Sequence, residues 1–320
     1  MRESPRLRLG ISSCLLGEAV RFDANHKHDA YLTGTLGQFF DFVGVCPEVA
    51  IGLGVPRPPI RLVGDPDAPR AVGVRDPNLD VSGPLTAYGA ETAARLPDLA
   101  GYIFKSKSPS CGVFRVKVYP EGGGPGRTGR GLYARTFMHA QPLLPVEEEG
   151  RLGDPDLRDN FLERVFTYAR WCELMAEGLS AAALVRFHAH HKLSLMAHDP
   201  RAPAQLGRLV AAGPRGHGGD LAALAQAYIQ LLMPTLQKPA TIKRHANVLQ
   251  HLAGYLKRDL DAEDRAELAE LIDAYRRGEV PRAAPLALLR HHFRRHPDPY
   301  IGTQAYLYPP TRAERLLRGI

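Results

Sequence analysis

The chain has 320 residues, 44% hydrophobic and 23% charged, which is typical of a globular protein with room for two domains. No apolar run approaches the ~20 residues that a membrane span requires, so the sequence argues against a membrane-spanning helix and predicts a cytoplasmic protein. We expect the four cysteines to be thiols, metal ligands or catalytic groups rather than disulfides.

The net charge of +7 is shared unevenly between the two halves. Residues 1–150 hold 17 Lys and Arg against 16 Asp and Glu, whereas residues 151–320 hold 24 against 18. A basic second half indicates a nucleic-acid partner, and a charge that serves only solubility is the alternative.

The first half predicts strands that alternate with helices. The expected strands are residues 7–12, 39–46, 60–63, 71–74, 101–105 and 113–119. The expected helices are residues 30–40, where two glycines weaken the pattern, and residues 82–96, with Pro84 in the first turn. Strands separated by helices predict a largely parallel, Rossmann-like α/β sheet.

The second half predicts only helices. Residues 120–131 read as a flexible loop, and residues 142–153, with three successive glutamates, as the linker between domains. The expected helices beyond it are residues 156–177, 181–197, 220–233, 239–257, 262–276 and 285–296. We therefore predict an α/β domain over residues 1–150 and an all-helical, basic domain over residues 151–320.

Three cysteines fall at or just past the ends of predicted strands: Cys14, Cys46 and Cys111. Ligands of parallel α/β sheets bind beyond the carboxyl ends of the strands, so three strands can deliver three thiolates to one crevice. Thiolates select zinc, Cu(I) or an iron–sulfur cluster, although buried structural cysteines are the alternative. Cys172 is expected to pack in the helical core, with a fourth metal ligand as the alternative.

Polar residues beside these cysteines suit catalysis. Glu48 follows Cys46 by two residues and is a candidate general acid or base, with a surface carboxylate as the alternative. Ser108 and Ser110 bracket Pro109 in front of Cys111, where they hydrogen-bond a substrate oxygen or the sulfurs of a cluster, or simply form the turn. Lys105 and Lys107 are candidates for phosphate contacts, or for contact with water alone.

Other short patterns do not support a cofactor site. The Gly52-Leu53-Gly54 segment lacks the third glycine of a dinucleotide fingerprint, and residues 124–131 lack the closing Gly-Lys-Ser/Thr of a P-loop. No nucleotide cofactor is therefore expected. The His26-Lys27-His28-Asp29 run is interpreted as a polar loop or helix start rather than a metal site.

Four segments in order resemble the bacterial thiouracil desulfidase (TudS-like) domain: ISSCLLG at 11–17, VRFDANHKHD at 20–29, VCPEVAIGLGVPRPPIRLV at 45–63 and KSKSPSCG at 105–112. Segments of the second half resemble the helical, YbgA-type domain often fused behind it: residues 184–200, 243–258, 285–293 and 300–310. Together they resemble the RudS family of tRNA 4-thiouridine desulfidases.

The resemblance implies a [4Fe-4S] cluster held by Cys14, Cys46 and Cys111, with its fourth iron open. It implies that Glu48 is catalytic, and that the active-site serine is Ser108 as first choice or Ser110 as second. The expected reaction replaces the sulfur of 4-thiouridine in tRNA by oxygen and releases hydrosulfide without redox change.

The basic helical domain is expected to bind the tRNA backbone, since a stacked base must be drawn out to react. The candidate phosphate contacts are Lys105, Lys107, Lys243, Arg244, His245, Arg290, His291, His292, Arg294 and Arg295. A solvated helix face is the alternative for each of them.

Three alternatives to this function stay open at this point. The protein acts on free thiouracil or thiouridine with a helical domain that dimerises, it is a redox or radical iron–sulfur enzyme, or it is a nucleic-acid binder with structural zinc. The CxxxCxxC pattern of radical enzymes is absent from the sequence.

Overall fold

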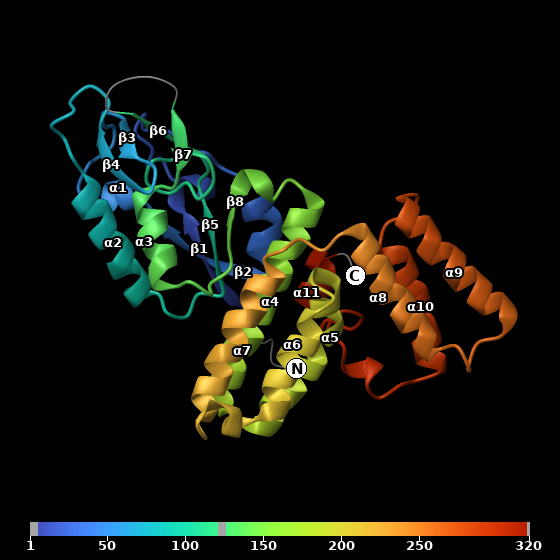
Figure 1. Ribbon diagram of the computed structural model, residues 1–320. Helices are drawn as coiled ribbons and strands as arrows, with labels where there is room; N and C mark the ends of the chain where they lie inside the picture. The colour runs from blue at the N-terminus through green and yellow to red at the C-terminus, as the bar shows by residue number, and fades with distance from the viewer. Residues whose placement is uncertain (1–5, 121–125, 319–320) are drawn as a thin grey trace. The chain divides into compact units, whose positions relative to one another are not determined.

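The computed structural model describes residues 6–120 and 126–318, and the chain divides into two compact units, Met1–Phe161 and Leu162–Ile320 (Figure 1). Helix α4 (Pro155–Glu177) begins in the first unit and continues into the second. None of the helices in the described residues combines the length and apolarity that a membrane crossing needs.

The first unit contains a four-stranded parallel sheet, which confirms the predicted α/β class. Its strands are β1 (Leu7–Ser12), β2 (Phe40–Val45), β5 (Gly101–Phe104) and β8 (Val146–Glu148), in the spatial order β2-β1-β5-β8. All four residues of β5 are buried, as expected for an inner strand of a covered parallel sheet. The carboxyl ends of these strands therefore lie at one edge.

A second sheet of mixed direction, which the sequence did not predict, follows the order β4-β3-β6-β7. Its strands are β3 (Ile60–Asp65), β4 (Ala68–Gly73), β6 (Val116–Tyr119) and β7 (Arg127–Gly129). The strands predicted at residues 60–63 and 71–74 correspond to β3 and β4, which pair antiparallel as a hairpin. The predicted loop at 120–131 is wrong for β7, which pairs with β6; residues 121–125 of that loop lie outside the described residues.

Helices α2 (Ser82–Arg95) and α3 (Leu132–Ala140) pack against each other at Gly89, where a Cβ atom would lie 2.8 Å from the Tyr133 carbonyl oxygen. The Tyr133 and Phe137 rings of α3 contact the Tyr102 ring of β5, so α3 covers the sheet. The sequence did not predict α3. The helix predicted at residues 30–40 is instead a π-helical turn, Tyr31–Thr35, followed by a 3-10 turn, Leu36–Gln38.

The segment predicted as a linker, residues 142–153, belongs to the first unit, and that prediction is wrong. It contains β8 and the 3-10 turn Glu149–Arg151, and both Glu147 and Glu148 are buried. Three successive carboxylates are stable in this largely buried segment because each accepts hydrogen bonds from other groups of the unit.

The described part of the second unit contains helices and no strand, as predicted. After α4 come α5 (Ala181–His198), α6 (Ala202–Ala212), α7 (Leu221–Leu236), α8 (Ile242–Tyr255), α9 (Ala262–Arg277), α10 (Ala283–Arg295) and α11 (Arg312–Arg318). Of these, α6 and α11 were not predicted. Several helices, α4 and α11 included, begin at a side chain that accepts a backbone N–H: Asp154, Ser180, Asp220, Thr241, Asp261 and Thr311.

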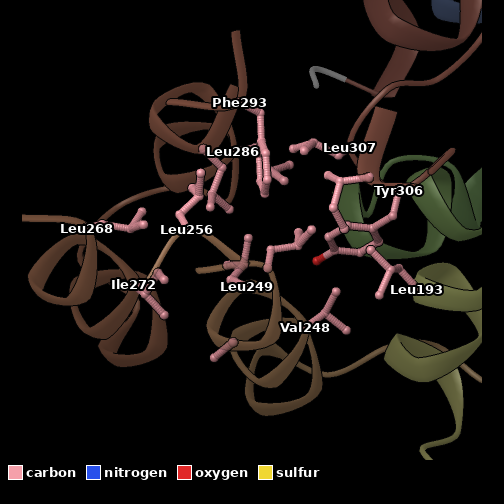
Figure 2. Close-up of a cluster of buried hydrophobic side chains, with 14 of the residues drawn as sticks. Leu193, Val248, Leu249, Leu256, Leu268, Ile272, Leu286, Phe293, Tyr306 and Leu307 are labelled. Atoms are coloured by element: carbon pink, nitrogen blue, oxygen red, sulfur yellow. The ribbon is translucent and has the colours of Figure 1, made fainter. Parts of the chain in front are cut away.

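A cluster of buried apolar side chains joins α8, α9 and α10 to α5 and to the segment before α11 (Figure 2). Leu249 of α8 and Leu256, the residue just after α8, lie near Leu268 of α9 and Leu286 of α10, while Leu193 approaches from α5. The period of these leucines along each helix is what made the helical prediction possible.

Candidate functional site

A cavity of about 320 Å³ lies at the carboxyl ends of β1, β2 and β5. Cys14, Cys46 and Cys111 all line it, although 32 and 65 residues separate them in the sequence. The three cysteines thus meet where a parallel sheet delivers its strand ends.

Each cysteine has a different local support. Cys14 lies in the 3-10 turn Ser13–Leu16, which Gly17 ends with a φ of 97° that favours glycine. Cys46 precedes the short helix α1 (Pro47–Ala50), and its thiol donates to the Val20 carbonyl oxygen at 3.7 Å. Cys111 lies in the segment that follows β5. The position of each of the three sulfurs is therefore set by the turn that follows a strand.

Burial makes these three thiols hard to ionise. It raises the pKa of Cys14 to about 11, against a lowering by Lys105. Burial also raises the pKa of Cys46, and it holds the pKa of Cys111 well above its usual range. A neighbouring thiolate raises the pKa further at Cys14 and at Cys111, so the three sulfurs become thiolates together only beside a cation.

The three thiols fit an iron–sulfur cluster. No set of three His, Cys, Asp or Glu side chains in the described residues converges closely enough to hold one metal ion. In a cluster each cysteine binds a different iron, so the ligands can line one cavity, as Cys14, Cys46 and Cys111 do here. The iron atoms would also supply the positive charge that buried thiolates require.

Glu48 lies in the first turn of α1, lines the cavity and is held on both carboxylate oxygens. Its Oε1 accepts from the Ser110 hydroxyl at 2.8 Å, and its Oε2 accepts from Arg57 Nε at 2.9 Å. The side chain of Glu48 is 15% exposed and that of Arg57 is 3% exposed. The carboxylate is therefore fixed in one orientation beside Cys46.

The two serines of the SPSC segment occupy different positions. Ser108 lines the cavity, and its Oγ accepts the N–H groups of Ser110 (3.2 Å) and Cys111 (3.1 Å), so its own O–H remains able to donate. Ser110 is fully buried and donates to Glu48. Ser108 is thus placed to meet a ligand, whereas Ser110 orients the carboxylate.

Arg57, which occupies the position of the missing third glycine, is a site residue that the sequence interpretation did not identify. Its guanidinium also donates to the carbonyl oxygens of Gly54 (2.8 Å) and Val20 (2.9 Å). A basic residue within a proline-rich segment just after a catalytic candidate was the available signal. Its partner is visible only in the folded chain.

Replacing Arg57 with glutamine should lower the free energy of unfolding by about 3 kcal/mol, because it leaves Glu48 partly buried without its cation. Urea unfolding of Arg57→Gln, Glu48→Gln and the double variant measures the coupling between the two residues. We expect a coupling energy of about 1–3 kcal/mol. Additive effects of the two substitutions would contradict the ion pair.

Three lysines line the same cavity. Lys105 forms an ion pair with Glu149 and donates to the Ser106 hydroxyl at 2.9 Å. Lys27 and Lys107 are exposed, and within residues 6–120 and 126–318 neither ammonium group has an ion-pair partner. The rim of the cavity therefore carries two available positive charges.

The remaining predicted phosphate contacts lie in the second unit. Lys243, His291, Arg294 and Arg295 are exposed. Arg244 donates to the His198 carbonyl oxygen at 2.6 Å and Arg290 to that of Leu307 at 2.8 Å, so both help to hold the fold. As phosphate contacts these residues stay a prediction.

Three predictions about side chains in the second unit are wrong. His292 is 2% exposed and His245, whose ring bonds the Tyr306 hydroxyl at 2.9 Å, is 8% exposed, so neither can contact a phosphate. Cys172 was expected in the core, yet its side chain is exposed because the buried stripe of α4 continues through Trp171 instead.

Two protein families match this chain, one in each of its two units. The family described as 2-thiouracil desulfurase matches residues 9–149, and the family described as protein of unknown function (DUF1722) matches residues 192–310. The uncharacterized protein YbgA of Escherichia coli (strain K12) is 35% identical over 148 residues, which is 46% of this chain and 86% of YbgA.

A solved structure of a [4Fe-4S]-dependent thiouracil desulfidase, TudS, is 30% identical to this chain. The match covers 47% of this chain and 95% of that one, with a TM-score of 0.36. From the two family matches and the identity to YbgA, this chain belongs to the two-domain proteins in which a 2-thiouracil desulfurase domain precedes a domain of the YbgA type.

Proposed function

We propose that this protein is a tRNA 4-thiouridine desulfidase, which replaces the sulfur of the base by oxygen. Membership of residues 9–149 in the 2-thiouracil desulfurase family supports carbon–sulfur bond cleavage. The observation that carries the proposal is the cavity in which the thiols of Cys14, Cys46 and Cys111 meet Glu48 and Ser108. A thiol set with a fixed carboxylate suits replacement of a soft sulfur atom by water.

Cys14, Cys46 and Cys111 would hold a [4Fe-4S] cluster and leave one iron without a protein ligand. When the cluster is bound, that iron supplies a Lewis acid that polarises the carbon–sulfur bond. The name of the solved desulfidase TudS supports the same cofactor for this family.

Glu48 performs the proton transfers in this proposal. One of its carboxylate oxygens takes a proton from the attacking water, or donates a proton to a ring nitrogen as negative charge develops there. The oxygen of water bonds to the ring carbon, and the sulfur leaves as hydrosulfide, so no electron donor or nucleotide cofactor is needed. Ser108 donates a hydrogen bond to the base, while Arg57 and Ser110 hold Glu48 in place.

The positive rim favours a nucleotide over a free base. Free thiouracil carries no phosphate, whereas Lys27 and Lys107 at the cavity suit the phosphates that flank a nucleotide in tRNA. The basic charge of residues 151–320 extends this argument to the rest of the tRNA. A thiolated base drawn out of its stack would then enter the cavity.

Charge reversal at the rim should weaken tRNA binding without touching the chemistry. We expect Lys27→Glu and Lys107→Glu each to reduce the slope of log affinity against log salt by about 1. Fluorescence anisotropy with thiolated tRNA across a salt series measures this slope. Lys117→Glu, an equal charge change on the exposed face of β6, is the matched control; an identical loss in all three variants would refute specific contacts at the rim.

The decisive experiment compares holo and apo protein under anaerobic conditions. Protein with a reconstituted cluster is mixed with tRNA that contains 4-thiouridine, and the nucleosides are quantified after digestion. Loss of 4-thiouridine with a matching gain of uridine in the holo sample alone would support the proposal. If 4-thiouridine survives, turnover of free thiouracil by the same sample would assign the activity to the free base instead.

A further inference from the structure

We propose that Glu148 and Glu149, at the end of β8, are positioning residues for the third cysteine of the site. The segment from Lys105 to Phe114 carries Ser108 and Cys111, and these two glutamates, the acidic pair, bind it near both of its ends. The inference rests on the proposed function only in that Cys111 is assigned a role as cluster ligand.

Glu148 binds the segment just after Cys111. Its Oε1 accepts the backbone N–H groups of Val113 at 2.7 Å and of Phe114 at 2.9 Å. Glu148 is 5% exposed, and hydrogen bonds that backbone N–H groups donate to a buried carboxylate are among the stronger ones in proteins. The chain two residues beyond Cys111 is therefore fixed to the parallel sheet.

Glu149 binds the segment just before Ser108. Its Oε2 accepts the Ser106 N–H at 2.7 Å, and its Oε1 accepts the Ser106 hydroxyl at 2.7 Å. Lys105 completes this set with an ion pair to the same carboxylate. Because β8 is parallel to β5, the strand that leads into the segment, the acidic pair lies where that segment begins.

The residues between these anchor points have little freedom left. The Gly112 N–H donates to the Ser108 carbonyl oxygen at 2.9 Å, and the Ser108 hydroxyl accepts the Cys111 N–H. With both ends held, this turn presents the Cys111 sulfur to the cavity in one position. The acidic pair therefore has a positioning function that the charge of three successive glutamates did not indicate.

The Cys111 thiol is itself the probe for this inference. The rate of alkylation of each cysteine is measured by mass spectrometry in the metal-free full chain, and the rate of iron loss to a chelator is measured in the reconstituted protein. The variants are Glu148→Ala, Glu149→Ala and the conservative Glu148→Gln. Glu147→Gln, which removes a charge from the same strand, is the matched control.

In Glu148→Ala and Glu149→Ala we expect the alkylation rate of Cys111 to be about tenfold higher than in wild type. The alkylation rates of Cys14 and Cys46 should stay unchanged, and iron should be lost to the chelator faster. Glu148→Gln keeps an acceptor oxygen and should give a smaller increase, and it serves as the test if the alanine variant does not fold. Glu147→Gln should match wild type.

Two results would overturn the inference: an unchanged Cys111 rate in the alanine variants, or an equal acceleration of all three cysteines, which indicates general loosening of the unit. If wild type takes up no iron or sulfide, the proposed function fails. The alkylation rates in metal-free protein still decide whether the acidic pair positions Cys111.

Discussion

Replacing Glu48 with glutamine should lower kcat on 4-thiouridine tRNA by about 10²–10⁴, the usual contribution of a general acid or base. Glutamine has nearly the same volume but cannot exchange a proton with water or a ring nitrogen. Cys14, Cys46 and Cys111 remain in place, so the cluster should still assemble. Single-turnover loss of 4-thiouridine and the iron and sulfide content per chain measure these two effects separately.

Glu91→Gln provides the control for this substitution, because Glu91 lies on the exposed face of α2 with Arg95 as its partner at 3.7 Å. Its turnover should equal that of wild type. Undiminished turnover in Glu48→Gln, with normal iron content, would remove Glu48 from the mechanism. Loss of the cluster in the same variant would instead mean that Glu48 is needed to assemble or retain the cluster.

Replacing Gly131 with alanine should displace the segment that carries Cys111. An added Cβ atom would lie 2.5 Å from both the carbonyl carbon and the oxygen of Ser110, and 2.9 Å from the Cys111 nitrogen. These are backbone atoms, so the neighbouring chain must shift, at a cost of about 1–3 kcal/mol for overpacking. We expect a lower melting temperature and a lower iron content per chain.

The backbone conformation at Gly131, φ −61° and ψ 141°, is open to alanine, so the substitution tests the contact and not local strain. Gly83→Ala is the matched control, because a Cβ atom there meets nothing within 4 Å. Equal melting temperatures and iron contents for the two variants would mean that α3 and the Cys111 segment are not in close contact.

Much of the first unit follows from local sequence patterns. The strand predicted at residues 7–12 has the same bounds as β1, and the helix predicted at 82–96 ends one residue beyond α2. Apolar runs and a proline in the first turn are local signals, so the element that they predict does not depend on contacts with distant segments. The failures are the segments whose partners are distant, such as β7, α3 and β8.

The residues of the site divide in the same way. The short segments around Cys14, Cys46 and Cys111, and Glu48 beside them, indicate their chemistry through residue type and spacing alone. The sequence did not show that Arg57 pairs with Glu48, that Ser110 binds that carboxylate while Ser108 lines the cavity, or that Cys172 is exposed.

Residue type and period are properties of a short stretch, so the α/β half, the helical half and the cysteines and carboxylate of the candidate site could be predicted from local patterns. Contacts between distant segments were needed to show that residues 146–149 contain a strand and the acidic pair instead of a linker. A run of three glutamates is stable inside a protein only where N–H groups and cations meet it. The partners of Glu148 and Glu149 come from residues 105–114, which are distant in the sequence, so no local pattern indicates them.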